Sequence, residues 1–212
     1  MLKKGLATLA VVLACLGAVA AARHFAPTFK TATIDAKYQN RSKGNPKADL
    51  WVIEYTDFQC PVCSFAVKMI EEYVAYHPNE IYFQARYFPL IHSHRYGLKS
   101  AIYAECASRQ KKFWEFSEKI FEIQNEWSAS ADADAIFERV AAQMGLDIKA
   151  LTACVDDPAT KQVPLHERAE GKSLGVNSTP TFFVSGKKFE GPNAIKNEID
   201  NYFKNKAAGN KK

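Results

Sequence analysis

Cys60 and Cys63, separated by only two residues, stand between a segment typical of a strand and a segment typical of a helix. Residues 50–56 read Leu-Trp-Val-Ile-Glu-Tyr-Thr, a short and largely apolar run that favours a buried strand. From Cys63 onward, apolar residues recur at helical spacing to about Tyr76. Pro61 suits the first helical position, where a backbone N–H is not needed. The sequence therefore predicts a helix that begins at the cysteine pair, immediately after a central strand.

A cysteine at the start of a helix is activated by its position. The backbone N–H groups of the first turn and the helix dipole stabilise the thiolate of Cys60, which is the form that attacks disulfides. Cys63 lies on the same helical turn, close enough to attack a mixed disulfide and release the other thiol. We therefore interpret Cys60 as the more exposed nucleophile and Cys63 as the buried resolving thiol. A metal site or an inert structural disulfide is the alternative, but structural zinc takes four ligands, usually from two such pairs, and the chain has one pair.

The N-terminus has the layout of a secretory signal peptide. Lys3 and Lys4 precede an uncharged run, residues 5–22, that ends in small residues. We predict that residues 1–22 are a cleaved signal and that the protein reaches the periplasm or cell envelope. An uncleaved membrane anchor is one alternative, because eighteen uncharged residues are just long enough to span a bilayer, and retention in the cytosol is another. Cys15 is expected to be lost with the signal.

Four cysteines then remain in an oxidising compartment, where thiols tend to pair. Four cysteines allow three pairings, and the spacing pairs Cys60 with Cys63, leaving Cys106 and Cys154 for each other. We predict a structural disulfide between Cys106 and Cys154, with two buried free thiols as the alternative.

The composition excludes several classes of protein. Hydrophobic residues make up 47% of the chain and aromatic residues 12%, which rules out a disordered or low-complexity protein. The formal net charge of +5 becomes +3 when Lys3 and Lys4 leave with the signal, so the charge gives no argument for nucleic-acid binding.

The rest of the chain separates into strand and helix patterns. Residues 81–88 predict a second strand, and residues 181–184 and 188–189 flank a Ser-Gly-Lys sequence typical of a hairpin. Helices are expected at 98–108, at 113–121, at 133–144, at 148–155, in a segment started or kinked by Pro164 that ends near Gly175, and at 194–203.

This order predicts an α/β domain whose sheet is interrupted by an all-helical insertion. The predicted segments are a signal at 1–22, a leader or linker at 23–48 with one short strand near 31–34, a first half at 49–94, an insertion at 95–175, a second half at 176–205 and a basic tail at 206–212.

Two histidines, His92 and His94, stand at the start of the predicted insertion. Paired histidines can bind a metal, but no third ligand stands near them in the sequence. We therefore favour helix-capping or surface roles for both.

A second motif lies more than a hundred residues past the cysteine pair. Thr179-Pro180 comes immediately before the strand at 181–184, and a proline at the start of a strand often marks a cis peptide bond in a tight turn. With Cys60-Pro61-Val62-Cys63 after a strand, a helical insertion and a hairpin, the chain resembles the DsbA-like branch of the thioredoxin superfamily over roughly residues 48–205. The resemblance implies a thioredoxin fold with the helical insertion between a β-α-β half and a β-β-α half.

The resemblance also implies roles for individual residues. Cys60 matches the nucleophile, Cys63 the resolving cysteine, and Pro180 the cis-proline that faces the active site. Thr179 matches the residue whose backbone pairs with an extended substrate segment. Glu54, six residues before Cys60, matches a buried acidic residue that relays the proton of the resolving thiol. We favour this role because a carboxylate inside an apolar strand is costly without a function. The alternative for Glu54 is a charge near the end of a strand.

The function implied is an exported thiol–disulfide oxidoreductase. It would exchange disulfides with unfolded or partly folded exported proteins, most simply as an oxidant recharged by a membrane partner of the DsbB type, without a dissociable cofactor or metal. Val62 stands where strongly oxidising relatives carry histidine, which leaves open a reductase or isomerase recharged by a membrane thiol donor. Residues 23–48 are too few for a dimerisation domain, so a monomer is expected. A Cu(I) metallochaperone is the alternative from another class, although the chain has only three methionines.

Overall fold

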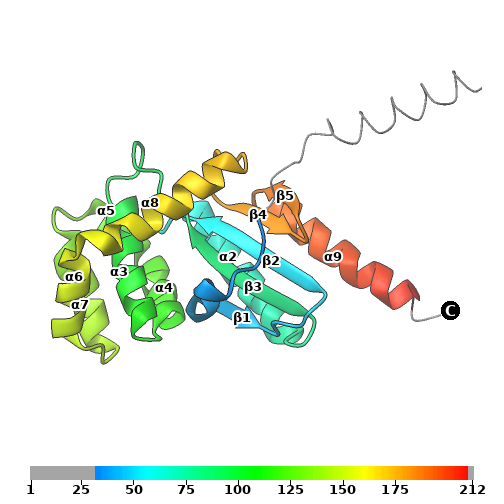
Figure 1. Ribbon diagram of the computed structural model, residues 1–212, viewed down its shortest axis with the longest axis horizontal. Helices are drawn as coiled ribbons and strands as arrows, with labels where there is room; N and C mark the ends of the chain where they lie inside the picture. Colours follow the sequence, from blue (N-terminus) through cyan, green and yellow to red (C-terminus); the bar gives the residue numbers. More distant parts are fainter. Residues whose placement is uncertain (1–31, 210–212) are drawn as a thin grey trace, which may run out of the picture. The chain divides into compact units, whose positions relative to one another are not determined.

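The computed structural model of the chain describes residues 32–209 (Figure 1). The predicted signal peptide or anchor, with Cys15, lies outside the described residues, as does the end of the basic tail. No helix between residues 32 and 209 is both long and apolar enough to cross a membrane.

A sheet with the strand order β1-β3-β2-β4-β5 forms the centre of the described part of the chain. Its strands are β1 (Ser42–Gly44), β2 (Leu50–Thr56), β3 (Ile81–Tyr87), β4 (Thr181–Val184) and β5 (Lys187–Glu190). β2 pairs in parallel with β3, and the other three pairings are antiparallel. The strands predicted at residues 50–56 and 81–88 and the predicted hairpin are therefore confirmed.

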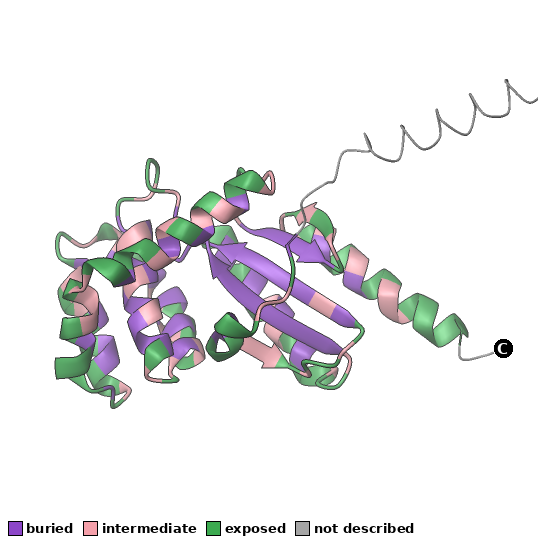
Figure 2. Ribbon diagram, viewed as in Figure 1, coloured by how far each residue is buried: buried purple, intermediate pink, exposed green. Residues whose placement is uncertain are grey.

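The middle strand, β2, is buried along nearly its whole length because both faces of the sheet are covered, and most of its residues are apolar (Figure 2). The two helices of the sheet domain are α2 (Pro61–Tyr76) and α9 (Pro192–Gly209). They cover one face, where Val52, Ile70 and Ile199 belong to one buried cluster. On the other face, Ile53 packs in a cluster with Phe88 and with apolar residues of the loop after the insertion.

Helices fill the chain between β3 and β4. They are α3 (Gly97–Arg109), α4 (Phe113–Glu122), α5 (Gln124–Ala129), α6 (Ala133–Gln143), α7 (Ile148–Asp156) and α8 (Pro158–Ser173). Their common core is aromatic, with Phe116, Trp127 and Phe137 fully buried. A disulfide joins Cys106 of α3 to Cys154 of α7. The predicted fold class, a thioredoxin-like sheet with a helical insertion between its halves, is confirmed.

Two helix predictions in this block need correction. The sequence predicted no helix at α5, which has only six residues and too few positions to show a period. Of the two roles expected for Pro164, starting the helix or kinking it, the first is wrong: Pro164 lies inside α8, which begins at Pro158 with Asp157 as its N-cap.

The described part of the predicted linker is built into the fold. The strand predicted near residues 31–34 is wrong: residues 32–35 have no regular structure, a short 3-10 helix η1 (Ala36–Arg41) follows, and the strand is β1. β1 pairs with β3 at the edge of the sheet. Sequence pattern missed it because a three-residue polar strand has no apolar alternation.

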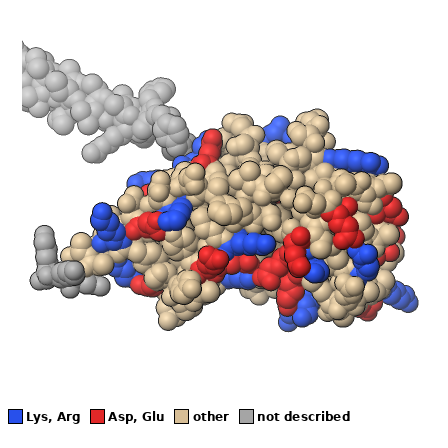
Figure 3. Space-filling view, turned by 180° about the vertical axis from the view of Figure 1, so that it is seen from behind, with Lys and Arg blue, Asp and Glu red and all other residues tan. Residues whose placement is uncertain are grey.

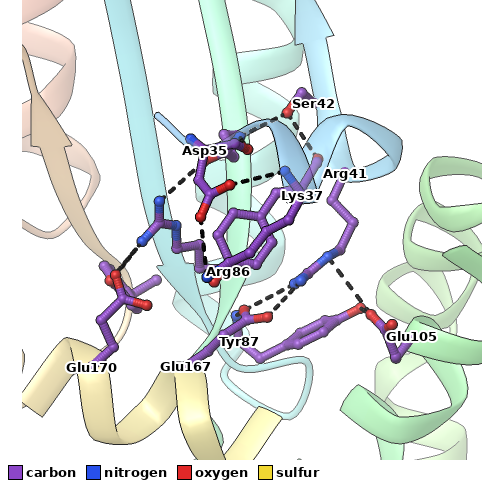
Figure 4. A network of polar contacts seen from close by, with 12 residues as sticks. Asp35, Lys37, Arg41, Ser42, Arg86, Tyr87, Glu105, Glu167 and Glu170 are labelled. Carbon is purple, nitrogen blue, oxygen red and sulfur yellow. Dashed lines mark hydrogen bonds and ion pairs between the residues drawn. The ribbon is translucent and has the colours of Figure 1, made fainter. Parts of the chain in front are cut away.

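Two ion pairs connect η1 and β3 to α8 (Figure 4). Arg41 donates to both carboxylate oxygens of Glu167, at 2.9 and 2.5 Å, and Glu167 also accepts the backbone N–H of Tyr87 at 2.7 Å. Arg86 donates to Glu170 at 2.6 Å. The first pair is almost completely buried, so these side chains hold the N-terminal segment and α8 against the sheet. Elsewhere, the face shown in Figure 3 interleaves acidic and basic side chains.

Candidate active site

The cysteine pair begins helix α2, where the sequence predicts it. Cys60 is the N-cap residue and Pro61 the first helical residue. The backbone N–H of Cys60 donates to the carbonyl oxygen of Asp57 at 3.0 Å, and the N–H of Cys63 donates to the carbonyl oxygen of Cys60 at 3.1 Å. Both thiols are free; Cys60 keeps 7% of its surface exposed, whereas Cys63 is completely buried.

The environment of Cys60 favours its thiolate. A hydrogen bond from the Cys63 thiol, only partly offset by burial, lowers the pKa of Cys60 to about 6, and the backbone N–H groups of Cys63 and Val62 add to the effect. These N–H groups belong to the first turn of α2, where no carbonyl within the helix accepts from them. At neutral pH Cys60 is therefore mainly the nucleophilic form.

The environment of Cys63 favours its neutral thiol. Burial raises the pKa of Cys63 well above its ordinary value, and the hydrogen bond to Cys60 and the charge of Glu54 raise it further. The pKa values of the two cysteines, which lie on one helical turn, are thus shifted in opposite directions. An attacking thiolate and a protonated neighbour are what stepwise disulfide exchange uses.

Glu54 is a completely buried carboxyl on β2, close to the cysteine pair. Neither of its carboxyl oxygens has a hydrogen-bond partner among the described residues. Burial raises the pKa of Glu54 to about 8; the nearby Thr56 hydroxyl opposes this rise, and the charges of Glu71 and Cys60 add smaller contributions to it. At neutral pH this group is therefore mainly a protonated acid.

Thr179 and Pro180 come from the other half of the sheet and lie against the cysteine pair. The peptide bond between them is cis, and the sulfur of Cys60 lies 3.4 Å from the carbonyl oxygen of Thr179. The N–H of Thr179 has no hydrogen-bond partner among the described residues. A backbone donor is therefore available beside the reactive sulfur.

Asp57, which sequence analysis did not single out, holds the loop before Cys60. One carboxylate oxygen accepts the backbone N–H of Gln59 at 2.7 Å. The other accepts the N–H of Leu90 at 2.6 Å and lies 3.0 Å from Nδ1 of His94. His94 is thus tied to the redox loop rather than to a helix end. The signal that could have found Asp57 is an acid three residues before the cysteine, at the end of a buried strand.

Two apolar side chains on the first turns of α2 are exposed to solvent. Val62 and Phe65 project from the first turns of α2, and Phe65 is 61% exposed. Sequence analysis assigned Phe65 no role, because a single aromatic residue on a helix is ordinarily core.

Within residues 32–209, no group of three or more His, Cys, Asp or Glu side chains is arranged so that it could hold a metal ion. Cys106 and Cys154, bonded to each other in the insertion, belong to a separate part of the fold.

A family model accounts for this combination of sheet, cysteine pair and cis-proline loop: the one described as Thioredoxin matches residues 36–201. The chain belongs to the thioredoxin family. Among solved structures of similar fold, a thioredoxin-like oxidoreductase from Silicibacter pomeroyi is 25% identical with a TM-score of 0.66, covering 82% of this chain and 99% of that one. The thioredoxin-family chain therefore shares its fold, over most of its length, with a protein described as a thioredoxin-like oxidoreductase.

Two further structures share the fold of this thioredoxin-family protein. α-DsbA1 from Wolbachia pipientis is 24% identical with a TM-score of 0.66, covering 81% of this chain and 94% of that chain. Oxidised BdbD from Bacillus subtilis is 19% identical with a TM-score of 0.69, covering 82% and 97%. The helical insertion is therefore part of a shared architecture.

The curated relatives are much longer proteins. The Na(+)/H(+) antiporter NhaA 1 of a Mycobacterium species (strain KMS) is 34% identical over 156 residues, which are 71% of this chain and 24% of the antiporter. NhaA 3 of Salinispora tropica is 30% identical over 150 residues, 71% of this chain and 22% of that protein. The chain spans about a quarter of the length of these relatives.

Proposed function

We propose that this protein is exported and introduces disulfides into other exported proteins through Cys60 and Cys63. The observation that carries the proposal is the 3.4 Å contact between the Cys60 sulfur and the carbonyl oxygen of Thr179. It sets a reactive sulfur beside a backbone segment whose N–H is free, so an extended client segment could pair with Thr179 while its cysteine meets Cys60. Clients are therefore unfolded or partly folded polypeptides.

The reaction begins with a disulfide between Cys60 and Cys63. A client thiolate attacks the Cys60 sulfur, the S–S bond breaks, and Cys63 leaves with the bonding electron pair. A second client thiolate attacks the client sulfur of the mixed disulfide, and Cys60 leaves as a thiolate. The client gains one disulfide and the protein two thiols. The lowered pKa of Cys60 makes it a good leaving group in the second step.

Glu54 supplies the proton for the first step. The Cys63 thiolate is unfavourable because its site is buried, which is why the pKa of Cys63 is raised. With a pKa of about 8, Glu54 is protonated at neutral pH and gives its proton to Cys63 as that sulfur leaves. It takes the proton back when the protein is reoxidised by a membrane partner of the DsbB type.

The direction of electron flow follows from the thiolate of Cys60. A stabilised thiolate stabilises the reduced form and makes the disulfide more oxidising. The presence of valine at position 62 favours the opposite direction, reduction or isomerisation. Its side chain offers the Cys60 thiolate neither a hydrogen-bond donor nor a charge, and a less stabilised thiolate makes the disulfide less oxidising. Equilibration with glutathione separates the two: an oxidant has a potential near about −120 mV and a thioredoxin-like reductant one near about −270 mV.

A pair of serine variants tests the chemistry itself. The oxidised protein is mixed with a reduced, unfolded test protein, and the free thiols of the test protein are counted. Wild type should remove them. The two single-cysteine variants are mixed instead with a test protein that carries a disulfide. In Cys63→Ser the Cys60 thiolate should attack that disulfide, release the other client sulfur as a thiolate and remain bound as a mixed disulfide, because no resolving thiol is left; Cys60→Ser should form no such adduct. An adduct of equal yield in both variants would contradict the assignment of Cys60 as the nucleophile.

A further inference from the structure

A small basic pocket lies beside the redox centre. Its volume is about 230 Å³, below the range of about 300–1,000 Å³ usual for small-molecule sites. The residues that line it are Phe88, Leu90, His92, Ser93, Arg168, Lys172 and Asn177. Arginine, lysine and histidine are among them, and no aspartate or glutamate.

Two of the segments that line the pocket are connected directly to the active site. Leu90 donates its backbone N–H to Asp57, the residue that holds the loop before Cys60. Asn177 stands two residues before Thr179, so their Cα atoms are at most about 7 Å apart. The pocket therefore borders the path along which an extended client segment would pair with Thr179.

The positive charge of the pocket is not neutralised from within the described part of the chain. Neither Arg168 nor Lys172 forms an ion pair there, whereas Arg41, Arg86 and Arg139 each do. The Nε of Arg168 is buried without a hydrogen-bond partner, and the guanidinium lies 5.8 Å from the ring of Phe88. A buried donor without a partner costs free energy that a bound acceptor recovers.

The nearest acids of the same helix are already engaged. Glu167 binds Arg41 and Glu170 binds Arg86, and Figure 4 shows both carboxylates turned toward these arginines. Glu167 and Glu170 of α8 therefore pair with arginines of η1 and β3, and neither of them neutralises Arg168, which lines the pocket.

We propose that this pocket binds the carboxylate of an aspartate or glutamate side chain in the client polypeptide, close to the cysteine that is oxidised. The guanidinium of Arg168 matches a carboxylate in shape and charge, and Lys172 adds a second positive charge. The Ser93 hydroxyl and the Asn177 amide are further donors on the wall. The inference rests on the proposed function, since it assigns the protein a preference among its clients.

Peptide oxidation tests the preference. Two-cysteine peptides, with amidated C-termini, carry aspartate or asparagine at successive positions on either side of the reactive cysteine, and kcat/KM is measured for each with the oxidised protein. We expect the aspartate peptide to be favoured about fivefold at one or two positions, as for a partly exposed ion pair, and the ratio to fall as salt is raised. A further peptide, with asparagine throughout and a free C-terminal carboxylate, reports whether a chain terminus serves as well as a side chain.

Variants assign the preference to the pocket. In Arg168→Gln the aspartate-to-asparagine ratio should fall to near one, while Lys161→Gln, an exposed lysine earlier in α8, should keep the wild-type ratio. A wild-type ratio near one at every position, or one that Arg168→Gln leaves intact, overturns the inference. Failure to oxidise even the asparagine peptides would instead overturn the proposed function.

Discussion

The sulfur of Cys60 lies 3.4 Å from the carbonyl oxygen of Thr179, although 119 residues separate the two in the sequence. The sheet brings them together, because Tyr55 of β2 pairs with Thr181 of β4. The antiparallel register sets the end of one strand against the start of the other, so the segments just beyond them meet. The whole helical insertion lies between the two halves of this site in sequence without separating them in space.

Replacing Glu54 with leucine should stabilise the protein in a pH-dependent way. The pKa of Glu54 is about 8 in the folded state against an ordinary 4.5, so between these values the unfolded chain is ionised and the folded one is not. Wild type therefore loses stability as the pH rises from about 4.5 to about 8. Urea unfolding of the oxidised forms should give similar free energies at pH 4 and a gain of a few kcal/mol for Glu54→Leu at pH 8. An equal difference at both values would show that Glu54 does not titrate in this range.

Replacing Val62 with histidine should make the protein a stronger oxidant. Val62 is exposed at the first turn of α2, so a histidine there can place a donor or positive charge near the Cys60 thiolate. We expect the pKa of Cys60 to fall and the redox potential to rise by roughly 30 mV, a tenfold change in the equilibrium constant. Glutathione equilibration measures this, with Val62→Leu as the control. An unchanged potential in Val62→His would mean that this side chain does not act on the thiolate.

Removing the disulfide of the insertion should destabilise the fold. Cys106 and Cys154 are 48 residues apart, and closing a loop of that length contributes about 4 kcal/mol by chain entropy. In urea unfolding, the free energy of unfolding of the Cys106→Ala/Cys154→Ala variant should be lower than that of wild type by about 4 kcal/mol. The redox potential of the Cys60–Cys63 pair should stay the same. A shifted potential would indicate that the two cysteine pairs are coupled.

Breaking the buried pair between Arg41 and Glu167 should cost far more than breaking an exposed one. Arg41→Met leaves the carboxylate of Glu167 buried without its partner, which costs about 3–5 kcal/mol. Arg139→Met, which breaks an exposed pair with Glu126, should cost no more than about 1 kcal/mol. Chemical unfolding of both variants makes the comparison. Equal losses would mean that η1 is not held to α8 through this pair.

Local patterns were enough to predict the strand, cysteine pair and helix at residues 50–76, since each of these signals lies within a few residues. The polar network was beyond such reasoning, because Arg41 and Glu167 are 126 residues apart and look like surface charges in sequence. The same holds for Asp57 with His94, and for the basic pocket, whose lining comes from three separate segments. Hydrogen bonds and ion pairs between residues far apart in the sequence produce no repeating pattern of apolar and polar residues, so the sequence alone does not predict them.

The pH dependence of Cys60 alkylation tests the central claim most directly. The reduced protein is treated with iodoacetamide over a range of pH, and the modified cysteine is identified by mass. The rate at Cys60 should rise with a midpoint near pH 6, because the thiolate is the reactive form and the pKa of Cys60 is lowered to about 6. A midpoint near the unperturbed value of about 8.5 would contradict the activation of Cys60 on which the account depends.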